Sequence, residues 1–103
     1  MKITISETAK TSLKEIVDFL KANWTVKEIQ VLETDIRKFR QTITEDIVKH
    51  QCLERFPDIK YTLIGKKQIK LMYEIKTDQV MIKLFWHCKQ DPAKLKYLLT
   101  DNN

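Results

Sequence analysis

The sequence has few of the glycine and proline residues typical of linkers, and it has no long apolar run typical of a membrane span. Its 103 residues include only one Gly and two Pro, which excludes flexible linkers and low-complexity tails. Its apolar runs extend for only a few residues, too short for a bilayer-spanning segment, and the first residues do not resemble a signal peptide. We therefore expect a single domain over residues 1–103, located in the cytoplasm and not attached to a membrane.

Cysteine and glycine are also scarce. The chain has two cysteines, Cys52 and Cys88, which are too few for a disulfide-stabilised fold. Without an export signal we expect both thiols to be reduced. A single glycine excludes a glycine-rich phosphate loop and argues against a nucleotide-binding enzyme. His50 with Cys52, and His87 with Cys88, are zinc-ligand types, but neighbours at these spacings point in different directions. We expect no metal and no cofactor.

The charge is positive and unevenly distributed. Nineteen Lys and Arg against fourteen Asp and Glu give a net charge of +5, and residues 58–103 hold nine basic and five acidic groups. A positive half of this kind suits a nucleic acid or an acidic protein segment. An ordinary solvated surface would tolerate the same charge.

The apolar periodicity of the first half predicts a short strand and two helices. Residues 2–5 alternate as a half-buried strand does, and apolar side chains then recur at helical spacing through residue 24 and again from 29 to 43. Thr25 and Glu28 form a capping box between the two runs. The sequence therefore predicts a tight antiparallel helical hairpin.

After Pro57 the period changes to two, which predicts three strands joined by short loops as an antiparallel meander. Asp91-Pro92 is typical of the start of a final short helix. The fold class predicted is α+β, in the order β-α-α-β-β-β-α. An N-terminal strand and an antiparallel helical hairpin accompany an antiparallel β-sheet, and the hairpin packs on that sheet.

Strict alternation divides the strand residues between two faces. The helices are expected to cover Tyr61, Leu63, Ile69, Leu71, Tyr73, Ile75, Val80, Ile82, Leu84 and Trp86. The opposite face is expected to carry Lys60, Thr62, Lys70, Met72, Glu74, Met81, Lys83, Phe85 and His87. Met72, Met81 and Phe85 would form an exposed apolar patch, which is typical of a partner site. Alternatively, Leu95, Leu98 and Leu99 of the final helix fold back and cover the patch.

Several segments together resemble the toxins of the RelE/ParE superfamily of type II toxin-antitoxin systems. They are Leu53-Glu54-Arg55-Phe56-Pro57, the strand at residues 69–75 with its Tyr-x-Ile ending, and Phe85-Trp86 followed by Lys89-Gln90-Asp91-Pro92. The resemblance covers nearly the whole chain. It implies a helical hairpin on an antiparallel sheet whose open face or groove holds a segment of an acidic antitoxin. The antitoxin-binding residues predicted on this basis are Lys70, Met72, Met81, Lys83 and Phe85.

The resemblance leaves two activities open, because RelE-like members cleave mRNA on the ribosome whereas ParE-like members poison DNA gyrase. For a metal-independent nuclease, the candidate catalytic residues are Lys70, Lys83, His87, Tyr73 and Lys89, which would hold phosphate and transfer protons. No arginine follows Arg55, although family nucleases commonly carry arginines on the central strands, and lysine lacks the bidentate fork. We therefore favour a ParE-like toxin over a RelE-like nuclease. A degenerate toxin and a general nucleic-acid-binding module are further alternatives.

Overall fold

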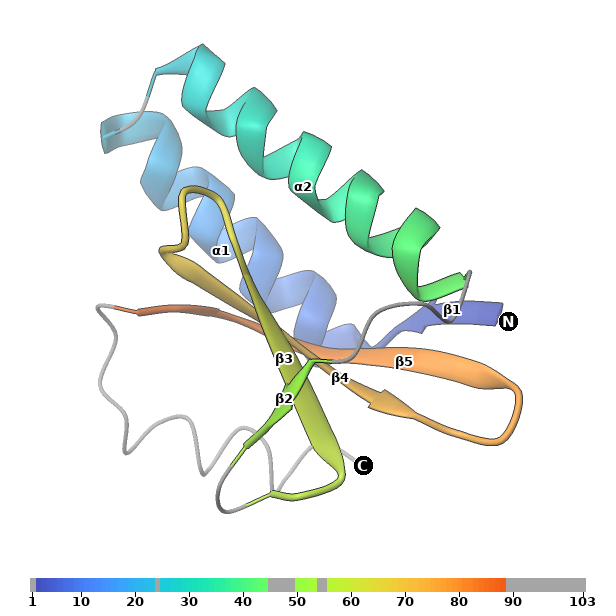
Figure 1. The fold of residues 1–103 in the computed structure, drawn as a ribbon. Coiled ribbons are helices and arrows are strands. Elements are labelled where there is room, and N and C mark those ends of the chain that lie inside the picture. Colours follow the sequence, from blue (N-terminus) through green and yellow to red (C-terminus); the bar gives the residue numbers. More distant parts are fainter. Residues whose placement is uncertain (1, 24, 45–49, 54–55, 89–103) are drawn as a thin grey trace.

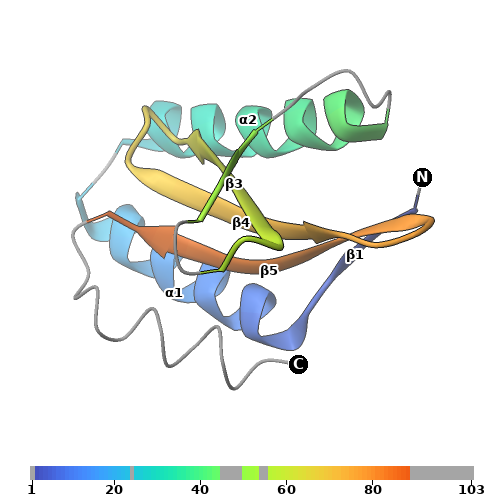
Figure 2. The same cartoon turned by 60° about the horizontal axis from the view of Figure 1, so that its bottom comes forward.

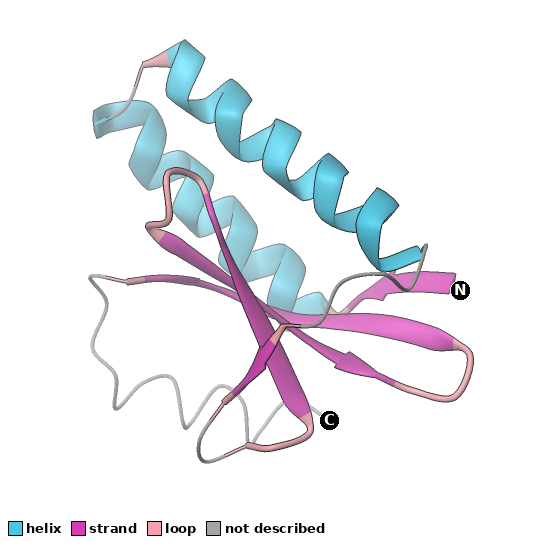
Figure 3. Ribbon diagram, viewed as in Figure 1, coloured by secondary structure: helices cyan, strands magenta, loops and turns pink. Residues whose placement is uncertain are grey.

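In the part of the chain that the structure describes, two helices pack on one face of a five-stranded sheet (Figures 1 and 3). A computed structural model describes residues 2–23, 25–44, 50–53 and 56–88. The elements are β1 (Lys2–Ile5), α1 (Glu7–Asn23), α2 (Val26–Thr44), β2 (Gln51–Cys52), β3 (Ile59–Ile64), β4 (Ile69–Ile75) and β5 (Gln79–His87). The α+β class is confirmed. The helix predicted after Asp91-Pro92 lies outside the described residues.

The strands lie in the order β1-β5-β4-β3-β2. β3, β4 and β5 form the predicted antiparallel meander. β1 runs parallel to β5, with Ile3 opposite Val80, so the sheet is mixed (Figure 2). The two-residue strand β2 was not predicted, and it pairs with Lys60 and Tyr61 of β3.

Local hydrogen bonds explain where the helices begin. The Ser6 hydroxyl accepts a hydrogen bond from the Ala9 amide at 3.0 Å and caps α1. At the start of α2, Glu28 N–H donates to Thr25 Oγ1 at 3.3 Å, and Thr25 N–H donates to the Glu28 carboxylate at 3.2 Å. The predicted capping box is confirmed. Both helices contribute to one apolar core with the sheet, which includes Ala9, Ile16, Leu20, Leu32, Phe39, Ile43, Leu71, Tyr73, Val80, Ile82 and Phe85.

A β-bulge in β5 changes which side chains face the helices. Tyr73 pairs with Ile82 whereas Met72 pairs with Leu84, so Lys83 is an extra residue. Helix α1 and the residue before it satisfy backbone groups at this point. Ser6 Oγ donates to the Lys83 carbonyl at 3.1 Å, and the Phe85 amide donates to Ser12 Oγ at 3.0 Å.

The bulge overturns the predicted faces of the end of β5, because one extra residue reverses the alternation beyond it. Phe85 and His87, expected on the open face, lie on the helix side opposite Leu71 and Ile69. Conversely, Leu84 and Trp86 were expected beneath the helices and face away from them.

The predicted phase of β3 was also wrong. Tyr61 pairs with Met72 and Leu63 with Lys70, so these side chains point away from the helices. Lys60 and Thr62 instead share the helix side with Tyr73 and Leu71, their partners in β4. Both faces of β3 carry apolar residues, so the alternation of the sequence could not tell which face meets the helices. The pairing of β3 with β4 determines that face.

The far face of the sheet, opposite the helices, holds a second apolar cluster. Ile59, Met72, Leu84 and Trp86 are buried there, and Leu53, Phe56 and Tyr61 are partly buried against them. This face is therefore not simply a solvated polar surface. The predicted cover, Leu95, Leu98 and Leu99, lies outside the described residues.

Candidate functional site

The residues predicted for catalysis do not converge on one face. Tyr73 and His87 lie on the helix side, whereas Lys70 lies on the far face with its ammonium 5.0 Å from the centre of the Tyr61 ring. Lys83 is the extra residue of the bulge, and its exposed fraction is 6%. Lys89 lies outside the described residues.

His87 is part of the packing between α1 and β5. Its exposed fraction is 7%, and its ring meets Phe19 of α1 edge to face, with centroids 5.7 Å apart. The sequence alternation predicted His87 on the face of the sheet opposite the helices. The bulge instead turns this side chain toward the helix.

The predicted antitoxin-binding residues are likewise divided. Lys70, Met72 and Met81 share the far face, where Met72 is fully buried and Met81 is half-buried. Phe85 is on the opposite side, 1% exposed in the core under the helices. The prediction that Met72, Met81 and Phe85 form one exposed patch is therefore wrong, because Phe85 lies on the other face of the sheet. The roles of these residues and of Lys83 in antitoxin binding stay predictions.

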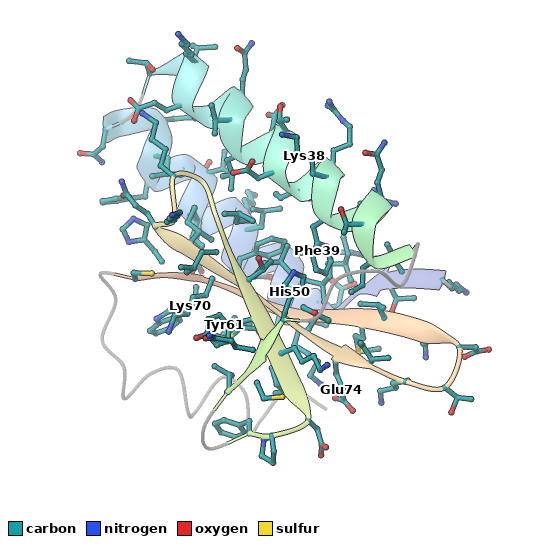
Figure 4. The ribbon with its side chains drawn as sticks, in the orientation of Figure 1. Lys38, Phe39, His50, Tyr61, Lys70 and Glu74 are labelled. Carbon is teal, nitrogen blue, oxygen red and sulfur yellow. The ribbon has the colours of Figure 1, made fainter. Side chains whose placement is uncertain are left out.

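A cluster that the sequence did not predict lies between α2 and the sheet. His50 Nδ1 is hydrogen-bonded to the Tyr73 hydroxyl. Phe39 of α2 contacts both rings: it stacks on His50 with centroids 6.1 Å apart, and it meets Tyr73 edge to face at 5.0 Å. Figure 4 shows His50 beside Phe39, and Lys70 beside Tyr61.

The surroundings hold both groups of this pair in their neutral forms. Burial, with a further contribution from the Lys60 ammonium, lowers the pKa of His50 below its usual 6.5. Burial, with a contribution from Cys52, raises the pKa of Tyr73 to about 12. A neutral imidazole has one donor and one acceptor nitrogen, so the bond to Tyr73 leaves Nε2 of His50 for another partner.

His50 also lines a groove of about 450 Å³ between α2 and β3. The described lining residues are Val31, Asp35, Lys38, Phe39 and Thr42 of α2, then His50, then Thr62, Leu63 and Ile64 of β3, and Lys66 and Lys67 of the following turn. Lysines are the commonest type among them, and Asp35 is the one acidic side chain. The groove is thus apolar at its base and positive at its rim.

The turn at the end of the groove has an unusual backbone. Gly65, Lys66 and Lys67 all have positive φ, at 59°, 59° and 64°, a region that costs non-glycine residues about 1–2 kcal/mol each. The Asp35 carboxylate holds the turn by accepting from the Gly65 amide at 2.9 Å, and Lys66 pairs with Glu28 of α2 at 3.3 Å. Two contacts to α2 therefore hold the turn against the helix.

Hydrogen bonding and charge also act on Glu28 at this contact. The Thr25 amide, followed by the Lys66 ammonium, holds the pKa of the Glu28 carboxyl below its usual value. Lys66 is thus engaged within the chain. Lys38 and Lys67 are exposed, and they give the groove rim its accessible charge.

The sequence offered only a weak signal for this site. His50 attracted attention as a zinc-ligand type beside Cys52, whereas its partner Tyr73 is 23 residues away. The signal that could have found the pair is the polar side chain of Tyr73 in a strand otherwise expected to be buried, because a buried tyrosine hydroxyl needs a partner.

Comparison with protein-family models and with curated proteins gave no match for this sequence. Within the described ranges, no helix has both the length and the apolar character needed to cross a membrane.

Proposed function

We propose that this chain is the toxin of a type II toxin-antitoxin system, a ParE-like growth inhibitor that poisons DNA gyrase and is neutralised by an acidic antitoxin. The proposal rests on the resemblance of its segments to RelE/ParE toxins. The strand, helical hairpin and meander lie in the order which that resemblance implies, and the net charge of +5 suits an acidic partner. A gyrase target would place the protein in the cytoplasm.

The observation that favours a ParE-like over a RelE-like activity is the division of the predicted catalytic residues. Metal-independent RNA cleavage needs a base, an acid and phosphate-holding cations around one scissile bond. Tyr73 and His87 lie on one face of the sheet and Lys70 lies on the other. A gyrase poison needs a binding surface and no such constellation.

A ribosome-dependent mRNA endoribonuclease is the second candidate, favoured by one observation. The His50–Tyr73 pair borders a groove whose rim carries Lys38 and Lys67. A neutral imidazole near exposed lysines has the residue types of an acid-base site for a phosphodiester. Under this alternative the reacting groups would lie on the helix side.

The deciding experiment is induction of the chain alone in bacteria, with growth, total mRNA integrity and plasmid supercoiling followed in one culture. We expect growth arrest with intact mRNA and altered supercoiling, and stabilised cleavage complexes when purified protein is added to DNA gyrase. Arrest with cleaved mRNA, abolished by His50→Ala and retained by the matched exposed-site variant Lys14→Ala, would support the nuclease instead. Unimpeded growth would contradict both activities and indicate a degenerate toxin or a binding module.

A further inference from the structure

The rim of the groove between α2 and β3 carries two lysines that nothing in the described chain neutralises. Lys38 and Lys67 are exposed and line the groove, and neither ammonium forms an ion pair within the described ranges. Two carboxylates of α2, Asp35 and Glu28, are engaged with the turn after β3. The two lysines therefore remain available to an anion from outside the chain.

Two uncharged polar side chains lie together on the sheet side of the groove. The pairing of Gln51 with Tyr61 brings His50, the residue before β2, next to Thr62, and His50 and Thr62 both line the groove. The Thr62 hydroxyl has no hydrogen-bond partner in the described chain. Burial raises the pKa of Tyr73 to about 12, so its hydroxyl keeps its proton and can donate to Nδ1 of His50, which leaves the imidazole proton on Nε2. His50 and Thr62 can then both donate to an anion.

The turn that carries Lys67 has a backbone that disfavours lysine. The Gln68 amide donates to the Gly65 carbonyl at 3.2 Å, so Lys66 and Lys67 are the two central residues of the turn. Both have positive φ, a conformation for which Asn-Gly is the usual pair. Strained positions of this kind cluster at ligand sites, and here the strained turn places a lysine at the groove rim.

The groove also has room and apolar surface for the body of a small molecule. Its volume of about 450 Å³ lies within the range of about 300–1,000 Å³ that is usual for small-molecule sites. Val31 and Phe39 of α2 and Ile64 of β3 line it. Leu63, also in the lining, is 43% exposed. A ligand with an apolar or aromatic body would cover these side chains.

The number of unpaired lysines selects the kind of anion. A phosphate monoester carries a charge of about −1.5 to −2 near neutral pH, which two lysines match, whereas proteins that bind nucleic-acid strands follow several phosphates along a groove. We propose that the α2–β3 groove binds a small phosphate monoester with an apolar or aromatic body. The phosphate lies between Lys38 and Lys67, beside Thr62, and the body lies against the apolar lining of α2. This inference does not depend on the proposed gyrase activity, which requires no ligand in the groove.

The test is a titration of the full chain, labelled with nitrogen-15 and followed by NMR. The probe is naphthyl phosphate. Two matched compounds divide its chemistry: naphthol keeps the aromatic body without the phosphate, and inorganic phosphate lacks the body. We expect naphthyl phosphate to bind most tightly of the three. It should shift the amide signals of Lys38, Thr62 and Lys67 and leave that of Lys14, exposed on α1, unchanged.

The variant Lys67→Gly separates binding from folding. Glycine accepts positive φ without strain, so this variant should melt at a higher temperature than the parent chain. It should nevertheless bind naphthyl phosphate about threefold or more weakly, as expected for loss of an exposed charge contact. Lys38→Met should weaken binding to a similar extent. Lys14→Met removes the same charge from α1 and should leave binding nearly unchanged.

The inference is overturned if naphthyl phosphate does not bind or shifts only signals from other surfaces. Equal affinity for naphthol would show that the phosphate is not recognised, and equal affinity for inorganic phosphate would show that the body is not. Unchanged binding by Lys67→Gly, or equal weakening by Lys14→Met, would place the ligand outside the groove. Displacement of the probe by an oligouridine that binds more tightly would assign the groove to a nucleic-acid strand instead.

Discussion

The hydrogen bond from the Phe85 amide to Ser12 Oγ, 3.0 Å long, makes the bulge of β5 testable. Phe85 is 1% exposed, so water cannot readily replace the lost acceptor in Ser12→Ala, and an unpaired buried amide costs about 1–3 kcal/mol. Alanine favours the helix over serine by about 0.5 kcal/mol. We therefore expect the free energy of unfolding to fall by about 0.5–2.5 kcal/mol in this variant.

Urea denaturation followed by circular dichroism measures this change. Thr11→Ala, at an exposed neighbouring position of α1, reports helix propensity without the hydrogen bond. Ser12→Thr keeps a hydroxyl and should lose less stability than Ser12→Ala. If Ser12→Ala and Thr11→Ala change stability equally, α1 does not hold the bulge, and the reasoning is refuted.

Three further predictions follow from the fold. Phe85→Ala should destabilise by about 3–5 kcal/mol and Met81→Ala by less than about 2, as measured in urea; the reverse order would return Phe85 to the open face. Thr25→Ala should lower stability by about 1 kcal/mol through loss of the α2 cap, and an unchanged melting temperature would contradict this. Because the pKa of His50 is lowered in the folded state, the unfolded chain binds its proton first as the pH falls. Stability should therefore decline as the pH drops through about 6.5 and level off below the lowered value; His50→Gln should remove this component, and an identical pH profile would argue against it.

The helical hairpin was predictable because its signals are local. Ser6, Thr25 and Glu28 mark helix starts within a few residues, and the apolar spacing between them has one clear period. The meander was predictable for a similar reason. The faces were not, because β5 carries large apolar side chains in both phases and the bulge depends on Ser12, far away in sequence.

The candidate site was predictable only in part. Lys70, Tyr73 and His87 were identified by residue type, but their positions depend on registers that the alternation did not fix. The His50–Tyr73 bond depends on where the chain enters β2, and the groove depends on how α2 lies against β3. The only sequence signal for either is the polar side chain of Tyr73 in a buried strand. The sequence shows that Lys66 and Lys67 carry positive charge, but it does not predict that their backbone is left-handed, with positive φ.

The bulge at Lys83 also bears on how this sequence can diverge. From Ile82 to His87 every residue of β5 is buried, with successive side chains entering opposite layers. A polar replacement of Ile82, Leu84, Phe85 or Trp86 would therefore bury a polar group and would not be a neutral surface change. A regular ladder that paired Lys83 with β4 would move Leu84 and Trp86 under the helices and Phe85 and His87 to the far side, whereas deletion of Lys83 would leave all four side chains on their present faces. Because β5 contributes side chains to both apolar layers, any change in its register alters both layers at once.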